Sequence, residues 1–437
     1  MKVSKYNFVF PFEEDANKHV MYNARTGALA LIENEKLKAY ESFSSSEINT
    51  IDEQLKENLK FGGFLIDSNI EEKQLLQYAL LTARHNKETL ILTVAPTLNC
   101  NFRCTYCYEK EKLQHLYMSQ EVQDELVNYV RKQANTLRTL TIIWYGGEPL
   151  LALDIVENLS KEFQLICKEH NIKYTANMVT NGYLLTPKIV KRLRPLDIDF
   201  IQVTLDGPAK VHDERRPLVG EKPTFETIVT NLLNTAHLLP NKVNLRINAD
   251  RTNAEAIDEI EELLIESGLM NITNPHLGYV DSINDAYTTS LCLSVSEFSD
   301  LDFEFKKRLD KHGKTSITNS YPAQRTAYCG ADSANSYVVN ADGALYKCWN
   351  DIGIEEKKVG DLLDDKFINT YANFSYMMYD ATIDAECAEC KYLPICMGGC
   401  PSKRINNPEI RCSEMKYKLD EYMKILPQVI RDERKKA

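Results

Sequence analysis

Apolar runs rich in β-branched and aromatic residues alternate with amphipathic segments between residues 90 and 280. The runs predict buried strands, and the segments with apolar positions every three or four residues predict helices. We expect strands at 90–95, 140–145, 174–179, 199–205, 243–248 and 276–280. We expect helices at about 119–134, 154–170, 187–194, 224–238 and 254–267. This alternation predicts an α/β fold with a parallel sheet, either a doubly wound sheet or a partial barrel.

Helix starts are predicted at two capping-box patterns, in which Ser or Thr precedes Glu by three residues. The pairs are Thr252 with Glu255 and Ser294 with Glu297.

Polar motifs follow the first four predicted strands, in the order APTLNC, GGEP, TNG and DGP. Ligands of parallel α/β folds bind at the carboxyl ends of the strands. The four motifs therefore predict one site on one rim of the sheet.

Length and charge exclude several classes of protein. The chain has 437 residues, enough for two or three domains, and a net charge of −11, which argues against a nucleic-acid binder. No apolar run reaches the roughly 18 residues of a membrane span, and the first residues do not resemble a secretory signal. We therefore expect a cytoplasmic protein with reduced thiols, whose 12 cysteines favour metal binding over disulfides.

Three cysteines crowd into the loop after the first strand, at Cys100, Cys104 and Cys107. Three thiolates can hold three corners of an iron–sulfur cube and leave one iron open to another ligand. A zinc site or structural thiols are the alternatives, although structural zinc prefers four protein ligands.

The spacing Cys-x3-Cys-x2-Cys, with Tyr106 before the last cysteine and GGEP one strand later, resembles the radical S-adenosylmethionine (radical SAM) family. This resemblance implies a partial (β/α)6 barrel and a [4Fe-4S] cluster whose open iron chelates S-adenosyl-L-methionine. One electron from the cluster would then cleave the cofactor and give a 5′-deoxyadenosyl radical, which abstracts hydrogen from the substrate.

The family pattern also implies cofactor contacts. Gly146 and Gly147 would offer backbone groups to the methionine amine, with Glu148 and Pro149 completing the turn. The backbone of Tyr106 would meet adenine. Three further residues would contact ribose or substrate, although an ordinary turn also explains their motifs: Thr180, Asn181 and Asp206. The polar run from His212 to Arg216 either faces the substrate or forms a solvated loop.

A second cysteine group occupies the C-terminal part, with a glycine at Gly343, and resembles the seven-cysteine SPASM domain of radical SAM peptide-modifying enzymes; a zinc ribbon is the alternative. The resemblance implies one auxiliary [4Fe-4S] cluster held by Cys387, Cys390, Cys396 and Cys412. It implies a second held by Cys329, Cys348 and Cys400. The second cluster would have an open iron or take Cys292 as its fourth ligand. If Cys292 is not a ligand, it belongs to the apolar interior, where we also expect Cys167.

The first 85 residues carry no catalytic signature. They predict short strands in FVFPF, VMYNA and ALALI, then helices from residue 44, a Gly-Gly turn and a strand. This small α+β pattern resembles the winged-helix-like leader-recognition domains of peptide maturases, which add a leader peptide to a sheet edge; a structural cap on the barrel is the alternative. The expected domains are 1–85, 86–315 for the barrel and 316–437 for the SPASM part.

The resemblance as a whole implies an oxidoreductase that modifies a ribosomally made precursor peptide and receives electrons from a flavodoxin- or ferredoxin-like partner. Its product would be a crosslink, foremost a thioether from a cysteine sulfur to carbon. Alternatives within the family are a carbon–carbon crosslink and formylglycine formation in a sulfatase. An alternative of another class is a non-catalytic iron–sulfur protein that binds peptides or carries electrons.

Overall fold

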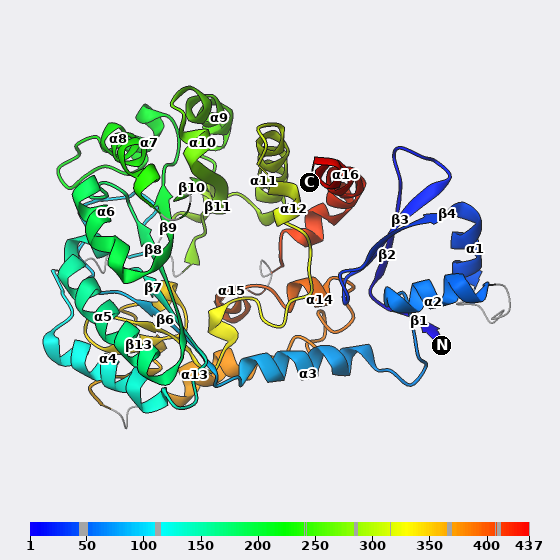
Figure 1. Cartoon of the computed structure of the whole chain (residues 1–437), viewed down its shortest axis with the longest axis horizontal. Helices are drawn as coiled ribbons and strands as arrows, with labels where there is room; N and C mark the ends of the chain where they lie inside the picture. Colours follow the sequence, from blue (N-terminus) through cyan, green and yellow to red (C-terminus); the bar gives the residue numbers. More distant parts are fainter. Residues whose placement is uncertain are drawn as a thin grey trace. The chain divides into compact units, whose positions relative to one another are not determined.

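The computed structural model describes residues 1–42, 51–109, 115–239, 241, 243–283, 287–314, 316–364, 369–406, 408 and 412–436 (Figure 1). The chain divides into two compact units. The barrel unit contains residues 85–294 and 330–378. The second unit, here called the two-ended unit, contains residues 1–84, 295–329 and 379–437.

The barrel unit is built on a parallel sheet in which all six predicted strands are confirmed. They are β6 (Thr89–Val94), β7 (Thr139–Trp144), β8 (Lys173–Thr180), β9 (Ile198–Thr204), β10 (Val243–Ala249) and β11 (Thr273–Tyr279). The strands pair in sequential order from β6 to β11, each parallel to the next. A doubly wound sheet would reverse its order at a switch point. The sequential order therefore supports the partial barrel.

Helices follow the strands, and Figure 1 shows several of them along one face of the sheet. The five predicted helices correspond to α4 (Gln120–Gln133), α5 (Leu153–His170), α6 (Pro187–Leu193), α8 (Phe225–Thr235) and α9 (Ile257–Glu266). Two further helices, α7 (Ala209–Arg215) and α10 (Leu269–Ile272), were not predicted. α4 begins after Ser119, whose hydroxyl accepts a hydrogen bond from the Val122 N–H at 3.2 Å.

The two predicted capping boxes have different outcomes. α11 (Val295–Lys311) begins directly after Ser294, as predicted. The prediction at Thr252 is wrong, because the helical turn η7 (Ala254–Ala256) begins after Asn253. The Thr252 hydroxyl instead donates to an Asp250 carboxylate oxygen at 2.5 Å.

The barrel sheet continues beyond β6 into the C-terminal part of the chain. β12 (Ser336–Val339) pairs parallel with β6, followed by antiparallel β13 (Ala344–Tyr346) and β14 (Gly360–Asp361). α13 (Thr370–Met377) completes this part. Residues 330–378 therefore belong to the barrel unit, which differs from the expected domain boundary. The physical reason is that β12 occupies the edge of β6 that would otherwise lack a partner.

The N-terminal part of the two-ended unit has the expected α+β character. β2 (Asn7–Pro11), β3 (Lys18–Asn23) and β4 (Leu29–Glu33) form an antiparallel sheet, and β1 (Lys2–Val3) pairs with β5 (Leu65–Ile66). The helices are α1 (Asn34–Ser42), α2 (Glu53–Phe61) and α3 (Glu72–Arg84). Residues 43–50, where the predicted helical segment starts, lie outside the described residues.

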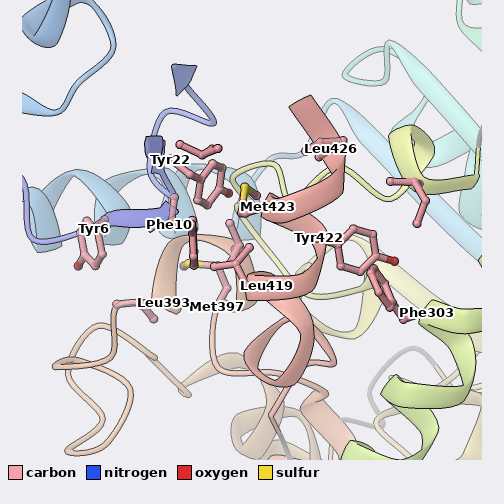
Figure 2. Packing of buried hydrophobic residues seen from close by; sticks show 14 of the residues in the cluster. Tyr6, Phe10, Tyr22, Phe303, Leu393, Met397, Leu419, Tyr422, Met423 and Leu426 are labelled. Atoms are coloured by element: carbon pink, nitrogen blue, oxygen red, sulfur yellow. The ribbon is translucent and has the colours of Figure 1, made fainter. Parts of the chain in front are cut away.

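Residues from both ends of the chain share one core in the two-ended unit. Tyr22 of β3 and Met423 of the C-terminal helix α16 (Met415–Lys436) are both fully buried in it (Figure 2). α11, α12 (Ser316–Asn319), α14 (Leu393–Cys396) and α15 (Pro401–Asn406) belong to the same unit. The first 85 residues therefore share one core with the C-terminal segment, and a second buried cluster lies among them alone, from Met21 to Leu65. Among the described residues, no helix combines the length and the apolar character needed to cross a bilayer.

Candidate active site

The three clustered cysteines lie in the loop that follows β6, at the carboxyl end of that strand. Each of Cys100, Cys104 and Cys107 is partly buried. The Cys107 N–H donates to the Cys104 carbonyl at 3.3 Å, and the Phe102 N–H donates to the Cys100 sulfur at 3.4 Å. The loop thus has a defined conformation that carries its thiols on one short turn.

Burial governs the protonation of these thiols. It raises the pKa of Cys104 and Cys100 above the ordinary range, and that of Cys107 to about 12. Without a metal the three thiols are therefore protonated, whereas coordination to a cation favours the thiolate. Within the described ranges, no three His, Cys, Asp or Glu side chains already surround a single metal position.

The GGEP turn after β7 is held against the cysteine loop. The Gly147 N–H donates to Thr97 O at 3.1 Å, and the Glu148 N–H donates to Asn99 O at 2.9 Å. Gly146 has φ of 103°, and a Cβ there would come within 2.7 Å of Thr97 O. A Cβ on Gly147 would collide with Asn99 O. Both glycines are therefore required for the close approach of the two backbones. The expected contact with a ligand amine is a separate role, in which the backbone carbonyls of the two glycines would accept the hydrogen bonds.

Glu148 ties the second and third motifs together. Its carboxylate is buried and accepts hydrogen bonds from the Thr180 hydroxyl at 2.7 Å and the Asn181 N–H at 2.8 Å. It also accepts the Leu150 N–H at 3.0 Å, which caps the helical turn begun by the buried Pro149. The Asn181 amide donates to the Asn101 side chain at 2.8 Å and so reaches the cysteine loop. The motifs after β6, β7 and β8 therefore meet on one rim, as predicted.

Asp206, after β9, is completely buried and holds the fourth motif to the cysteine loop. One carboxylate oxygen accepts the Asn248 N–H at 3.0 Å, and the other accepts the Tyr106 hydroxyl. Its own N–H donates to His212 Nδ1 at 3.1 Å. Tyr106 and Asp206 therefore stabilise the packing of the fourth motif against the cysteine loop. Their expected contacts with adenine, ribose or substrate stay predictions.

The polar run after DGP is not a solvated loop at three of its positions, because His212, Arg215 and Arg216 are buried. Arg215 donates to both carboxylate oxygens of Asp250 at 2.8 Å. The alternative of a solvated loop is therefore wrong for these residues. Sequence reasoning missed Asn248 and Asp250, although Asn248 lies at the carboxyl end of β10 and Asp250 directly follows this strand.

The second cysteine group is divided between the units. Cys348 belongs to the barrel unit, and the two-ended unit contains the other six. Within the latter, the Cys390 N–H donates to the Cys387 carbonyl at 3.0 Å, and the Tyr379 hydroxyl donates to the Cys387 sulfur at 3.6 Å. Burial raises the pKa of Cys396, and the neighbouring sulfurs of Cys412 and Cys390 raise it further. The proposed ligands of one auxiliary cluster therefore influence one another electrostatically.

The two remaining cysteines are buried in the barrel unit. Cys167 lies in α5 among apolar residues, as expected, and Cys292 points its sulfur toward Thr288 O at 3.8 Å.

Comparison with known proteins assigns this barrel. Residues 94–264 match the model of the radical SAM superfamily, and the match includes the cysteine loop, GGEP and the motifs after β8 and β9. This segment of the chain is similar to the radical SAM superfamily. The resemblance in the sequence is thereby confirmed.

Two curated proteins match the chain over more than half of its length. The cysteine-type anaerobic sulfatase-maturating enzyme of Clostridium novyi is 23% identical over 344 residues, covering 72% of this chain and 88% of that protein. The radical SAM cyclopropyl synthase TigE of Paramaledivibacter caminithermalis is 24% identical and covers 62% of this chain and 63% of its own.

Two solved structures have a similar fold. Native anSMEcpe with bound AdoMet and Cp18Cys peptide superposes with a TM-score of 0.60 at 19% identity, covering 80% of this chain and 100% of that one. Streptococcus suis SuiB bound to precursor peptide SuiA has a TM-score of 0.55 at 16% identity and covers 94% of this chain and 99% of its own.

The residues on the rim fit the cofactors of the superfamily, a [4Fe-4S] cluster and S-adenosylmethionine. Cys100, Cys104 and Cys107 supply three soft donors on one turn, the type of donor that iron–sulfur clusters use. The N–H to sulfur bond at Cys100 is a contact that stabilises a thiolate ligand. These three cysteines would hold the cluster of the radical SAM domain.

Proposed function

We propose that this radical SAM protein modifies a ribosomally made precursor peptide and forms a thioether between a cysteine sulfur and a carbon of the peptide. The observation that carries the proposal is the pairing of the three-cysteine rim with a complete seven-cysteine pattern in one chain. When bound, the cluster and S-adenosylmethionine supply the radical that abstracts hydrogen.

The residues of the chain would perform three tasks. Cys100, Cys104 and Cys107 would bind the first cluster, and the Gly146–Gly147 turn would orient the cofactor amine. Cys387, Cys390, Cys396 and Cys412 would hold one auxiliary cluster, and Cys329, Cys348 and Cys400 the other. The three-thiolate auxiliary site would have room for a substrate thiolate, which iron would keep deprotonated. A flavodoxin- or ferredoxin-like protein would supply the electrons.

A peptide substrate is supported by the extent of the structural matches. The likeness to SuiB, solved with its precursor peptide, covers 94% of this chain. The unmatched remainder is shorter than the first 84 residues, so the match extends into that segment. The likeness to anSMEcpe covers 80%. Among the described residues, β2 and β4 are the edge strands of the N-terminal sheet, and a leader peptide would add to such an edge.

The test is anaerobic turnover of precursor peptides with dithionite as reductant, followed by mass spectrometry. A thioether predicts loss of two hydrogens per crosslink and a cysteine that no longer reacts with iodoacetamide. Loss of two hydrogens with the cysteine still alkylated would indicate a carbon–carbon bond instead. Replacement of the cysteine sulfur by oxygen would indicate formylglycine.

A second measurement separates enzyme from carrier. We expect 5′-deoxyadenosine to form in the wild-type protein and not in Cys104→Ala. A wild-type protein fully loaded with iron that forms none would be a peptide-binding or electron-carrying protein, and the proposal would be wrong. Leaderless peptide is the control for the N-terminal part, and its turnover should be slower than that of the full precursor.

A further inference from the structure

Arg216 is a buried cation on the rim of the barrel. Its side chain donates to the Tyr106 hydroxyl at 2.5 Å, and its guanidinium lies 5.7 Å from the centre of the Phe102 ring. The residue is only 7% exposed. Its Nε is buried, and the described residues offer it no hydrogen-bond partner. One donor of this arginine therefore has nothing to bind in the polypeptide around it.

Arg215, the preceding residue, is a buried arginine whose charge is neutralised by carboxylates. Arg215 forms ion pairs with Asp250 at 2.8 Å and with Asp206 at 3.4 Å, and it donates to Asn248 O at 3.1 Å. Among the described residues, Asp206 reaches Arg216 only through the Tyr106 hydroxyl, which accepts from Arg216 and donates to Asp206. A buried charge without a direct partner is costly, and removing one partner of a buried ion pair costs about 3–5 kcal/mol. The site around Arg216 is therefore suited to an anion.

Arg216 lies against the cysteine loop on both sides of Cys104. It donates to the Tyr106 hydroxyl, two residues after Cys104, and its guanidinium lies over the ring of Phe102, two residues before Cys104.

Backbone pairing fixes this neighbourhood. The Thr105 N–H donates to Arg215 O at 2.9 Å, and the Arg103 N–H donates to Pro217 O at 2.8 Å. The Val219 N–H donates to Asn101 O at 2.9 Å, and Phe102 and Leu218 form an antiparallel bridge. Residues 101–105 and 215–219 are therefore joined like two strands, and Arg216 cannot move independently of the cysteine loop.

We propose that Arg216 is the built-in counter-charge of the cluster held by Cys100, Cys104 and Cys107, and that it raises the reduction potential of that cluster. The inference rests on the cofactor assigned in the proposed function. Reduction adds one electron from an external reductant such as dithionite and breaks no bond. A fixed cation in a medium of low dielectric stabilises the added negative charge. Arg216 is thus a positioning and tuning residue that acts through the cluster.

The test is a redox titration of the reconstituted full-length protein, without substrate, followed by electron paramagnetic resonance. The loop cluster is recognised as the signal that changes when S-adenosylmethionine is added. For Arg216→Gln we expect at least a tenfold fall in the equilibrium constant for one-electron reduction, which is about 59 mV. Arg216→Lys keeps the charge and should retain most of the potential. Lys210→Gln removes an exposed charge from α7, the helix that leads to Arg216, and should leave the potential unchanged.

The outcomes separate this inference from the proposed function. If Cys104→Ala contains as much iron as the wild type, the loop holds no cluster and the proposed function is wrong. If the cluster forms but Arg216→Gln titrates like the wild type, only the role of Arg216 is overturned. An unchanged potential with weaker binding of S-adenosylmethionine would likewise overturn it and assign Arg216 to the cofactor carboxylate.

A measurement on the unmutated side chain covers the case in which Arg216→Gln fails to load iron. Wild-type protein labelled with ¹⁵N-arginine should show a ¹⁵N coupling to the reduced loop cluster in pulsed resonance spectra. The coupling should disappear in Arg216→Lys. Its absence from the wild type would contradict the proposal.

Discussion

The Thr180 hydroxyl donates a hydrogen bond to Glu148 Oε1 at 2.7 Å and joins the carboxyl ends of β7 and β8. Both residues are almost completely buried. Burial also raises the pKa of Glu148, and the bonds from Asn181, Thr180 and Leu150 oppose this effect. Because the carboxylate cannot be solvated, its hydrogen bonds decide whether it can stay charged.

Thr180→Val should therefore destabilise the protein at nearly constant side-chain volume. One carboxylate oxygen would lose a donor in a buried site, which costs about 1–3 kcal/mol. The free energy of unfolding, measured anaerobically in denaturant, checks this. Thr136→Val removes an exposed hydroxyl and should change stability by less than about 0.5 kcal/mol. Equal losses in the two variants would show that the bond between Thr180 and Glu148 is not important.

Gly147→Ala should disrupt the cysteine loop, because the new Cβ would collide with the backbone at Asn99. We expect iron content after anaerobic reconstitution to fall by about one cluster of the three, with the loss on the cluster that responds to S-adenosylmethionine. Gly360→Ala is the control, since its Cβ would only come within 3.3 Å of the flexible Leu345 side chain. Full iron loading of Gly147→Ala would contradict the structural role given to this glycine.

The parallel sheet could be predicted from the sequence because each strand is recognised from a short run of consecutive residues. A buried strand such as β7 is a short apolar run, and β-branched residues fit it wherever it lies in the fold. The cysteine loop and GGEP could be placed on one rim for a related reason, since the carboxyl ends of parallel strands share one edge.

The parts that could not be predicted depend on partners far away in the chain. Arg215 and Arg216 lie in a charged run, which is usually solvated; they are buried because Asp250 and Tyr106 approach them from other loops. The division of the chain into two units also depends on distant partners. Tyr22 and Met423 are about as distant in sequence as this chain allows, and no local pattern encodes their common core.

His212 should make the protein lose stability in mild acid. Burial, together with the charge of Arg216, lowers the pKa of this imidazole to about 3, while the nearby Asp213 opposes the shift. The folded state therefore binds fewer protons than the unfolded state, whose histidine has a pKa near 6.5. The contribution of His212 is complete above that value and decreases as the pH falls below it.

Between pH 7 and pH 5 we expect the wild type to lose about 1–2 kcal/mol more unfolding free energy than His212→Asn. Asparagine keeps an acceptor for the Asp206 N–H, which His212 Nδ1 accepts at 3.1 Å, but it has no proton to gain. Parallel pH profiles of the two proteins would show that His212 does not titrate on unfolding.

The shared core of the two-ended unit leads to the last prediction. Met423 is fully buried beside residues of β2 and β3 (Figure 2), so Met423→Ala should leave a cavity and cost about 2–5 kcal/mol. Because both ends of the chain contribute to this core, amide hydrogen exchange should accelerate in Asn7–Pro11 and Lys18–Asn23 as well as in α16. Lys424→Ala changes the neighbouring exposed position and should leave both strands protected. Faster exchange confined to α16 would mean that the N-terminal sheet is stable without it and that the cluster from Met21 to Leu65 is sufficient to hold this sheet.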